Sequence, residues 1–397
     1  MKMKETRKYK HMELGLLPED WEVAKLGDIG YLLKGNGISK SQANSGDLCA
    51  VRYGELYTLH HNYIKTYNSH ISKEVALFAT KIQKGDILFA CSGETKEEIG
   101  KCAAFVDEVE AYAGGDILIL RTDQEKCSDI FLGFLLNMPI AANQKAAKGQ
   151  GDAVVHISKA SLENLSIPLP PIEEQRRIAS ALTSIDNLID SLDRLIAKKK
   201  DIKQGAMQQL LSGKKRLKGF TEPWVEKRLG NIVDIKRGVR VVKGELTEDG
   251  LFPVFQNTNK PLGYFNRNNV KAGTPYVIIG GSAGQIGICE RDYWAADDCA
   301  YFDCGDTISN KFLYFLLLFH EREIHSNVRS ASVPRLDRKA LVDLFVYFPS
   351  LPEQQAIASV LTSMDNELSA LEAKRKKYEQ IKQGMMQQLL TGRIRLI

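Results

Sequence analysis

The sequence predicts an α+β chain in which two mostly-β globular domains are separated by two long antiparallel coiled-coil helices with pseudo-two-fold symmetry. Three observations lead to this fold class. Residues 174–217 are repeated at 353–396 without a gap, and 24 of the 44 positions are identical. Each copy has helical periodicity, and the segments between the copies hold short apolar runs bounded by Gly and Asp. A repeat used only twice is no solenoid, and it suggests one chain imitating a dimer.

Each repeat is expected to form a long helix with one apolar seam. A helix from about residue 172 to 211 would be about 60 Å long, and it cannot bury a one-sided seam alone. We therefore expect the two copies to pair antiparallel, with two independent surface helices as the alternative. The seam residues follow coiled-coil spacing and are Ile178, Leu182, Ile185, Ile189, Leu192 and Ile196 in the first copy, and Ile357, Leu361, Met364, Leu368 and Leu371 in the second.

Proline and glycine mark the expected helix ends. Pro170 and Pro171 precede two glutamates, a combination typical of a helix start. Gly213 and Gly392 occupy equivalent positions where a left-handed C-terminal cap belongs. Each repeat also contains a glycine inside Ile-Lys-Gln-Gly, at residues 205 and 384, where it costs about 1 kcal/mol relative to alanine. A kink and a close backbone approach both explain these glycines, and the sequence does not choose between them.

The rest of the chain forms two dissimilar modules. We expect an N-terminal segment (1–20), module 1 (21–170), a central helical repeat (171–217), module 2 (218–349) and a C-terminal helical repeat (350–397). Residues 21–29 resemble residues 224–232 at an offset of 203, whereas the helical repeats are offset by 179, so module 1 is 24 residues longer. Short strands are expected in both modules, with one helix in each, at 130–137 and 311–320.

The charge of the chain is unevenly placed. The net charge is +5, with +1 over residues 1–20, −3 over 21–170, +4 over 171–223, +1 over 224–349 and +2 over 350–397. Nearly neutral modules permit nucleic-acid binding, but a domain that binds DNA alone is usually more basic. If DNA is the ligand, we expect a partner to supply part of the phosphate contacts.

The sequence indicates a cytoplasmic chain without membrane contact. No apolar run approaches the roughly 20 residues of a membrane span, and the charged N-terminus lacks the apolar core of a secretory signal. Seven cysteines without a C-x-x-C pair are expected to be free thiols rather than disulfides or zinc ligands.

No catalytic motif is present. Residues 280–284 are glycine-rich but lack the Gly-Lys-Ser/Thr of a phosphate-binding loop, so they are expected to form a tight turn. Gly-Gly-Ser-Ala-Gly at 280–284 has the letters of G-x-S-x-G, but a tight turn is expected there rather than a nucleophile elbow, and H-E-x-x-H is absent. We therefore expect a chain that recognises rather than reacts, with no cofactor or metal of its own.

Both modules carry loops rich in side chains that read DNA. Asn and Gln pair with adenine, Arg and Lys pair with guanine, and the same cations bind phosphates. For each loop taken singly, a solvated turn is the alternative. The candidate contacts in module 1 are Lys34, Asn36, Ser39, Lys40, Gln42, Arg52, Tyr53, Lys96, Lys148 and Gln150. Those in module 2 are Lys236, Arg237, Arg240, Lys243, Gln256, Asn257, Asn259, Lys260, Arg267 and Arg335.

With these features the chain resembles the DNA specificity (S) subunit of type I restriction–modification systems over nearly its whole length. The resemblance rests on Leu-Gly-Asp at 26–28, Leu-Gly-Asn at 229–231 and Lys-Gly-Asp-Ile-Leu-Phe at 84–89. Its most specific part is Ile-Pro-Leu-Pro-Pro-Ile-Glu-Glu-Gln at 167–175, which recurs as Phe-Pro-Ser-Leu-Pro-Glu-Gln at 348–354. The second copy departs from the pattern at Ser350, which stands where the first copy has Pro171.

The resemblance implies two target recognition domains, each reading half of a split double-stranded DNA target, with the helices fixing the distance between the halves. It also implies partners: two copies of an adenine methyltransferase subunit and, beyond them, restriction subunits that act as translocase and nuclease. S-adenosylmethionine, ATP and Mg²⁺ would then belong to those partners. The alternatives are a protein–protein scaffold that makes no direct DNA contact and an enzyme with an unrecognised site.

Overall fold

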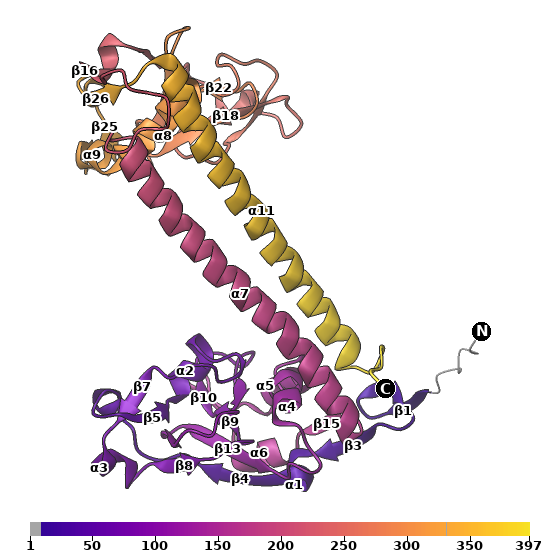
Figure 1. The fold of residues 1–397 in the computed structure, drawn as a ribbon. Helices are drawn as coiled ribbons and strands as arrows, with labels where there is room; N and C mark the ends of the chain where they lie inside the picture. Colours follow the sequence, from indigo (N-terminus) through magenta and orange to yellow (C-terminus); the bar gives the residue numbers. More distant parts are fainter. Residues whose placement is uncertain (1–8, 331) are drawn as a thin grey trace. The chain divides into compact units, whose positions relative to one another are not determined.

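The computed structural model describes residues 9–397 except residue 331, and the chain divides into two compact units (Figure 1). Unit 1 contains the chain up to residue 190 together with residues 376–397, and unit 2 contains residues 191–375. Each unit therefore holds one module and parts of both long helices. The first eight residues of the expected N-terminal segment, and the side chain of Lys243, lie outside the described part.

The two repeats form helices α7 (Ile172–Leu210) and α11 (Leu351–Leu389), and the helices pair antiparallel. In unit 2, Asp193 pairs with Arg375 and Lys203 pairs with Asp365, so the numbering rises along one helix and falls along the other. In unit 1, Lys382 of α11 lies 2.5 Å from Asp186 of α7. The alternative of two independent surface helices is wrong.

The predicted seam is largely buried. All six seam residues of α7 are buried, as are Ile357, Leu361 and Leu368 of α11, whereas Met364 and Leu371 are half-buried. Gly213 and Gly392 follow the helices with φ of 69° and 70°, which confirms the left-handed caps. A Cβ on Gly205 or Gly384 would meet no heavy atom within 4 Å, so close backbone approach within the chain does not explain them.

Module 1 is built on two main sheets. One has five strands in the order β4-β13-β9-β11-β6, and the other has four in the order β7-β5-β12-β8. Strand β3 pairs antiparallel with β15, so the beginning and end of the module lie together. The bounds are β1 (Tyr9–Met12), β2 (Gly15–Pro18), β3 (Glu22–Lys25), β4 (Gly30–Lys34), β5 (Leu48–Val51), β6 (Asn62–Tyr63), β7 (Ser69–Ile71), β8 (Thr80–Ile82), β9 (Ile87–Ala90), β10 (Ser92–Gly93), β11 (Cys102–Ala104), β12 (Ala111–Ala113), β13 (Ile117–Thr122), β14 (Val155–His156) and β15 (Ser166–Leu169).

Module 2 repeats this plan with fewer strands. Its sheets have the orders β17-β23-β20-β21 and β19-β18-β22, and β16 pairs with β26 as β3 pairs with β15. The bounds are β16 (Val225–Arg228), β17 (Asp234–Arg237), β18 (Phe252–Phe255), β19 (Gly263–Phe265), β20 (Pro275–Ile278), β21 (Ile286–Ile288), β22 (Trp294–Ala295), β23 (Cys299–Asp303), β24 (Val328–Arg329), β25 (Arg335–Leu336) and β26 (Phe345–Phe348).

The two modules share a frame that the sequence comparison did not reveal. The sheet neighbours β4-β13-β9-β11 correspond to β17-β23-β20-β21, and β12 pairs parallel with β5 as β22 pairs parallel with β18. A glycine directly follows the first strand of each frame and donates its N–H to a carbonyl of the neighbouring strand, Gly35 to Ile117 and Gly238 to Cys299, both at 2.8 Å. These two glycines are 203 residues apart, so the weaker repeat continues into the sheet.

The expectation of one helix per module is wrong. The expected helices are α4 (Asp129–Leu135) and α8 (Asn310–Phe319), but shorter helices accompany them. Segments of four to ten residues carry too little periodicity to be distinguished from turns in the sequence. The additional helices are α1 (Leu26–Ile29), α2 (Tyr53–Thr58), α3 (Lys73–Ala76), α5 (Pro139–Lys148) and α6 (Lys159–Glu163) in module 1, and α9 (Glu321–Ser326) and α10 (Arg338–Val342) in module 2.

Candidate nucleic-acid interface

The loop that follows β4 is the first cluster of predicted DNA contacts, and the fold holds it firmly. Ser39 and Gln42 bond one another, because both the backbone N–H and the hydroxyl of Ser39 donate to the Gln42 amide oxygen at 2.9 Å. Ile38 anchors the loop in a small apolar cluster. Lys34, Asn36 and Lys40 are exposed. The structure therefore gives Ser39 and Gln42 a role in shaping the loop and leaves the other three facing solvent.

The remaining predicted contacts of module 1 lie on segments that touch one another. Arg52 and Tyr53 stand at the start of α2, and Tyr57 of the same helix donates its hydroxyl to the Ser92 carbonyl at 3.0 Å. Strand β10, which begins at Ser92, pairs with β14, and His156 of β14 bonds in turn to the backbone of Gln150. The fold thus connects α2, the loop that carries Lys96 and the segment 148–150, although they are far apart in sequence.

One predicted loop of module 1 is not a loop. Residues 145–148 belong to α5, and the side chain of Lys145 is only 2% exposed. Its ammonium donates to the Gly100 carbonyl at 2.6 Å, and burial lowers its pKa. Lys148 is half-buried, and Gln150 is exposed.

In module 2 the fold gathers four cations around one pocket. Arg237 at the end of β17 and Arg335 of β25 line a pocket of about 490 Å³ together with Arg338 and Lys339 of α10. The bridge between Gly280 and Arg335 brings these segments together. Sequence reasoning selected Arg237 and Arg335 but missed the other two, although Arg335, Arg338 and Lys339 fall within five residues. Asp337 is the acidic residue in the lining, and Arg335 also pairs with Asp298 at 3.2 Å. The four cations still outnumber these two acids, so the pocket suits an anion such as a phosphate.

Other predicted contacts of module 2 already have partners within the chain. Lys236 lies 2.6 Å from Asp303, and this hydrogen bond raises the pKa of the lysine. The Asn259 side chain donates to the Ile286 carbonyl at 2.8 Å, and the Gln256 amide donates to Asp297 at 3.4 Å. The guanidinium of Arg267 lies over the Phe265 and Trp294 rings at 4.9 and 5.8 Å, while remaining exposed.

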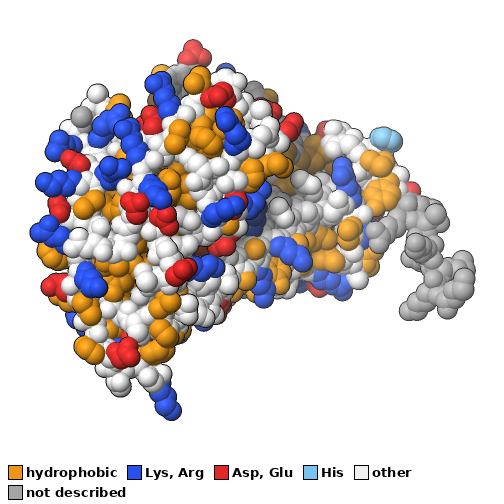
Figure 2. Space-filling view, turned by 90° about the horizontal axis from the view of Figure 1, so that it is seen from above, with side chains coloured by type: hydrophobic (Ala, Val, Ile, Leu, Met, Phe, Trp, Pro, Cys, Tyr) orange, Lys and Arg blue, Asp and Glu red, His pale blue; other side chains and the backbone are white. Residues whose placement is uncertain are grey.

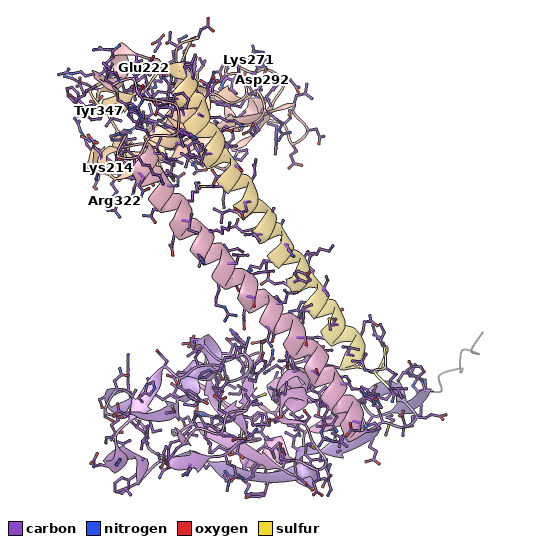
Figure 3. All side chains as sticks on the ribbon, viewed as in Figure 1. Lys214, Glu222, Lys271, Asp292, Arg322 and Tyr347 are labelled. Atoms are coloured by element: carbon purple, nitrogen blue, oxygen red, sulfur yellow. The ribbon has the colours of Figure 1, made fainter. Side chains whose placement is uncertain are left out.

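Three predicted contacts in the described part of module 2 are exposed and make no side-chain hydrogen bond, ion pair or ring contact: Arg240, Asn257 and Lys260. Lys243 was also predicted, but its side chain lies outside the described atoms. Other cations of the module are paired with acids, for example Lys271 with Asp292 at 3.0 Å (Figure 3). Figure 2 shows the same mixture, with Lys and Arg side chains interspersed with acidic and hydrophobic ones rather than forming one continuous basic field.

Comparison with known proteins decides the family. The model of the type I restriction modification DNA specificity domain matches residues 18–201 and again residues 221–383. The chain belongs to this family. Each match contains one module and most of the helix that follows it, so the internal repeat corresponds to two specificity domains in one chain.

Curated relatives are specificity subunits as well. The chain is 27% identical to the type I restriction enzyme MjaVIII specificity subunit of Methanocaldococcus jannaschii, with 98% of this chain and 96% of the relative aligned. It is 26% identical to the type I restriction enzyme EcoKI specificity subunit of Escherichia coli, over 54% of this chain and 46% of the relative.

Solved structures support the fold of this specificity chain. A type I restriction–modification S subunit from M. genitalium aligns with a TM-score of 0.68 at 18% identity, covering 98% of both chains. A chain from a study of complex assembly and conformational transition in a type I system aligns with a TM-score of 0.56 at 20% identity, covering 95% of this chain and 99% of that one.

The described residues also bear on metal binding and on membrane insertion. They contain no group of three or more His, Cys, Asp or Glu side chains arranged to hold a metal ion. Within the same residues, no helix combines the length and apolar content needed to cross a membrane.

Proposed function

We propose that this specificity chain is a non-catalytic subunit that reads a bipartite double-stranded DNA target, one half-site with each module. The observation that carries the proposal is the shared sheet frame. The same strand order is used twice, and the loop after the first strand keeps its first glycine and last lysine but differs at the four positions between them, from Gly-Asn-Gly-Ile-Ser-Lys at 35–40 to Gly-Val-Arg-Val-Val-Lys at 238–243. One frame with two sets of side chains is suited to reading two different sequences.

Module 2 offers the clearest division of roles. The pocket formed by Arg237, Arg335, Arg338 and Lys339 would hold backbone phosphates and set the register, because phosphate contacts position a protein without reading sequence. The exposed side chains of Arg240 and Asn257 would then reach base edges, Arg toward guanine and Asn toward adenine. In module 1, Lys34, Asn36 and Lys40 would supply the corresponding contacts.

The helical repeats support docking of two identical partners. Lys198, Ile202, Gly205 and Gln209 follow a 4-3-4 spacing along one face of α7, and residues 377, 381, 384 and 388 repeat them identically on α11. Ile202 is 47% exposed and Ile381 38% exposed, and both glycines border open space. Packing within the chain does not require these identities, whereas two copies of the same partner would.

We propose adenine methyltransferase subunits as these two partners, with restriction subunits that translocate DNA and cleave it joining the complex. S-adenosylmethionine would bind the methyltransferase, and ATP and Mg²⁺ the restriction subunits. We expect this assembly in the cytoplasm, where the DNA is. Gly205→Leu or Gly384→Leu should each remove one methyltransferase copy from the complex, because a leucine would fill the space at the glycine.

The decisive experiment is to co-express the chain with its methyltransferase and map methylated adenines in the host DNA by long-read sequencing. The proposal expects one split motif with two dissimilar halves. Deleting seven residues at equivalent positions of α7 and α11 should change the spacer and leave both halves unchanged, whereas an unchanged spacer would contradict a ruler role. A complex that assembles but methylates no defined motif would favour a scaffold without DNA readout.

A further inference from the structure

Module 1 has an exposed apolar turn that folding does not explain. Leu77 and Phe78, between α3 and β8, are 81% and 72% exposed. Their neighbours Val75, Ala76 and Ala79 pack inward against Ile38, so the turn is a defined structure whose two largest apolar side chains point away from the cluster. Two adjacent large apolar side chains at this exposure suggest a contact with another molecule.

The turn lies against the first predicted DNA-contacting loop. The hydroxyl of Thr80 donates to the Lys34 carbonyl at 3.0 Å. On the other side, a Cβ placed on Gly37 would lie 3.3 Å from the Phe78 carbonyl oxygen. The apolar turn and the loop after β4 therefore form one continuous surface of module 1, and whatever binds the loop must also meet Leu77 and Phe78.

The surroundings of the turn favour a polyanion. Lys34, Lys40 and Lys73 are exposed, and none of them makes an ion pair with any part of the chain that the structure describes. Glu74 is the acidic side chain of α3 itself. Three available cations around an apolar tip match the arrangement in which proteins bind phosphates on either side of a base step and place an apolar side chain at the step.

The turn lies in a segment that is six residues longer in module 1 than in module 2, a quarter of the 24-residue difference between the modules. Fifteen residues separate β7 from β9, and they include α3, the exposed turn and β8, whereas nine residues separate the corresponding strands β19 and β20. Module 2 places exposed Val239 and Val242, 56% and 63% exposed, on the loop that follows its own first strand. Both modules thus expose apolar side chains at the same edge of the frame by different means.

We propose that the Leu77–Phe78 turn is an apolar wedge that inserts at a base step within the half-site read by module 1, flanked by phosphate contacts from Lys34, Lys40 and Lys73. The proposal rests on the proposed function, since it requires that module 1 bind DNA. Phe78 would stack on an unstacked base, and Leu77 would fill the space beside it.

The test uses the full chain in its methyltransferase complex and the duplex defined by the methylation map. Phe78→Ala should weaken binding on the order of tenfold, as for other aromatic–base stacks. The slope of log affinity against log salt should stay unchanged, because no phosphate contact is lost. Lys34→Ala should instead reduce that slope by about one. The matched control is Leu16→Ala, which removes a leucine that is 55% exposed on β2, outside the surface formed by the turn and the loop after β4.

Insertion itself is measured with duplexes that carry a single 2-aminopurine at successive adenines. The wild-type complex should brighten one position, because unstacking relieves quenching, and Phe78→Ala should abolish that signal. The wedge proposal would be overturned if Phe78→Ala bound the duplex as tightly as Leu16→Ala, or if the 2-aminopurine signal were the same in Phe78→Ala as in the wild type. Sequence-specific binding by module 1 would stand in either case. If the wild-type complex bound the mapped duplex no better than an unrelated one, the proposed function itself would be wrong. This outcome is distinct from failure of the wedge proposal alone.

Discussion

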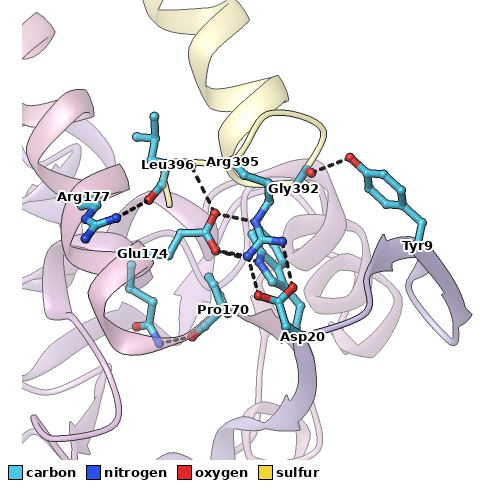
Figure 4. A network of polar contacts seen from close by, with 10 residues as sticks. Tyr9, Asp20, Pro170, Glu174, Arg177, Gly392, Arg395 and Leu396 are labelled. Atoms are coloured by element: carbon cyan, nitrogen blue, oxygen red, sulfur yellow. Dashed lines mark hydrogen bonds and ion pairs between the residues drawn. The ribbon is translucent and has the colours of Figure 1, made fainter. Parts of the chain in front are cut away.

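Replacing Arg395 with Met removes the cation from a closed polar network in unit 1 (Figure 4). Arg395 lies 2.6 Å from Glu174 at the start of α7 and 2.6 Å from Asp20, and its guanidinium lies over the Trp21 ring at 5.7 Å. The Trp21 indole N–H donates to the same Glu174 carboxylate at 3.0 Å. The last residues of the chain thereby hold the beginning of module 1 and the beginning of α7 together.

The loss of unfolding free energy in Arg395→Met follows from the burial of Glu174. Its side chain is 4% exposed, and removing one partner of a buried ion pair costs about 3–5 kcal/mol because the other charge stays buried. Two donors to Glu174 would remain, the Trp21 indole and the Leu396 N–H, and methionine keeps an apolar stem over the Trp21 ring. Asp20 is 54% exposed and adds little. We therefore expect the lower end, about 3 kcal/mol.

Native-state hydrogen exchange with peptide resolution measures this loss in each unit separately. Amides of β13 in unit 1 should exchange on the order of a hundredfold faster in Arg395→Met, while those of β23 in unit 2 should not change. Arg176→Met is the matched control, because Arg176 and Glu173 form an exposed pair on the same turn of α7, and its loss should cost under about 1 kcal/mol. Equal effects of the two substitutions would refute the reasoning from burial.

Three further predictions follow from the packing. Burial lowers the pKa of Lys145, so the unfolded chain keeps the ammonium proton to higher pH than the folded chain does. The free energy of unfolding should therefore rise with pH between the folded pKa and about 10.4, the pKa of an unperturbed lysine. Urea titrations of Lys145→Met should lack this rise. Gly205→Ala and Gly384→Ala should each stabilise the chain by about 1 kcal/mol in thermal unfolding, since the added methyl meets nothing. Gly35→Ala should destabilise module 1 by about 1–3 kcal/mol, because its Cβ would lie 2.1 Å from the Gly114 carbonyl oxygen, and an unchanged melting temperature would contradict this.

Local patterns predicted the helical part of the molecule and much of its strand content. The 4-3 spacing of the seam, the prolines before residue 172 and the glycines at 213 and 392 act within a few turns of helix, so the sequence displays them directly. The short apolar runs that follow Gly-Asp at 85–86 and 115–116 form β9 and β13, in agreement with the short strands expected in this module. The sequence did not predict the short helices. In α5 it therefore also missed the burial of Lys145, because ten residues with a lysine on the inner face resemble a polar loop.

The candidate interface was less accessible to prediction because non-local pairing assembles it. Arg237 meets Arg338 and Lys339 only because a bridge joins residues 280 and 335 across the sheet. The involvement of Ser39 and Gln42 in capping was equally hidden, since a polar side chain that faces DNA and one that shapes a loop look alike in sequence. One signal was available, because the offset of 203 continues to Gly35 and Gly238 and marks the equivalent loops.

The distribution of identities along the repeat now has a structural cause. Ten of fourteen positions are identical over 174–187 and twelve of sixteen over 202–217, but only two of fourteen over 188–201. The outer parts pack against modules: Ile178 and Leu182 lie in the core of unit 1, and Leu210 and Leu211 in that of unit 2.

The identical residues at the helix ends also form equivalent polar networks in the two units. Arg216, which follows α7, lies 2.6 Å from the fully buried Glu353 of α11, and the Trp224 indole donates to that carboxylate at 3.2 Å, as Arg395, Glu174 and Trp21 are arranged in unit 1. The segment that follows each helix thus contributes an arginine to a buried glutamate at the start of the other helix. This arrangement requires the same residues at both ends of the two repeats, whereas the middle of each repeat requires only apolar residues at the seam positions. The exposed identities at Ile202 and Gly205 fall outside this requirement, and the proposed docking of two identical partners would account for them.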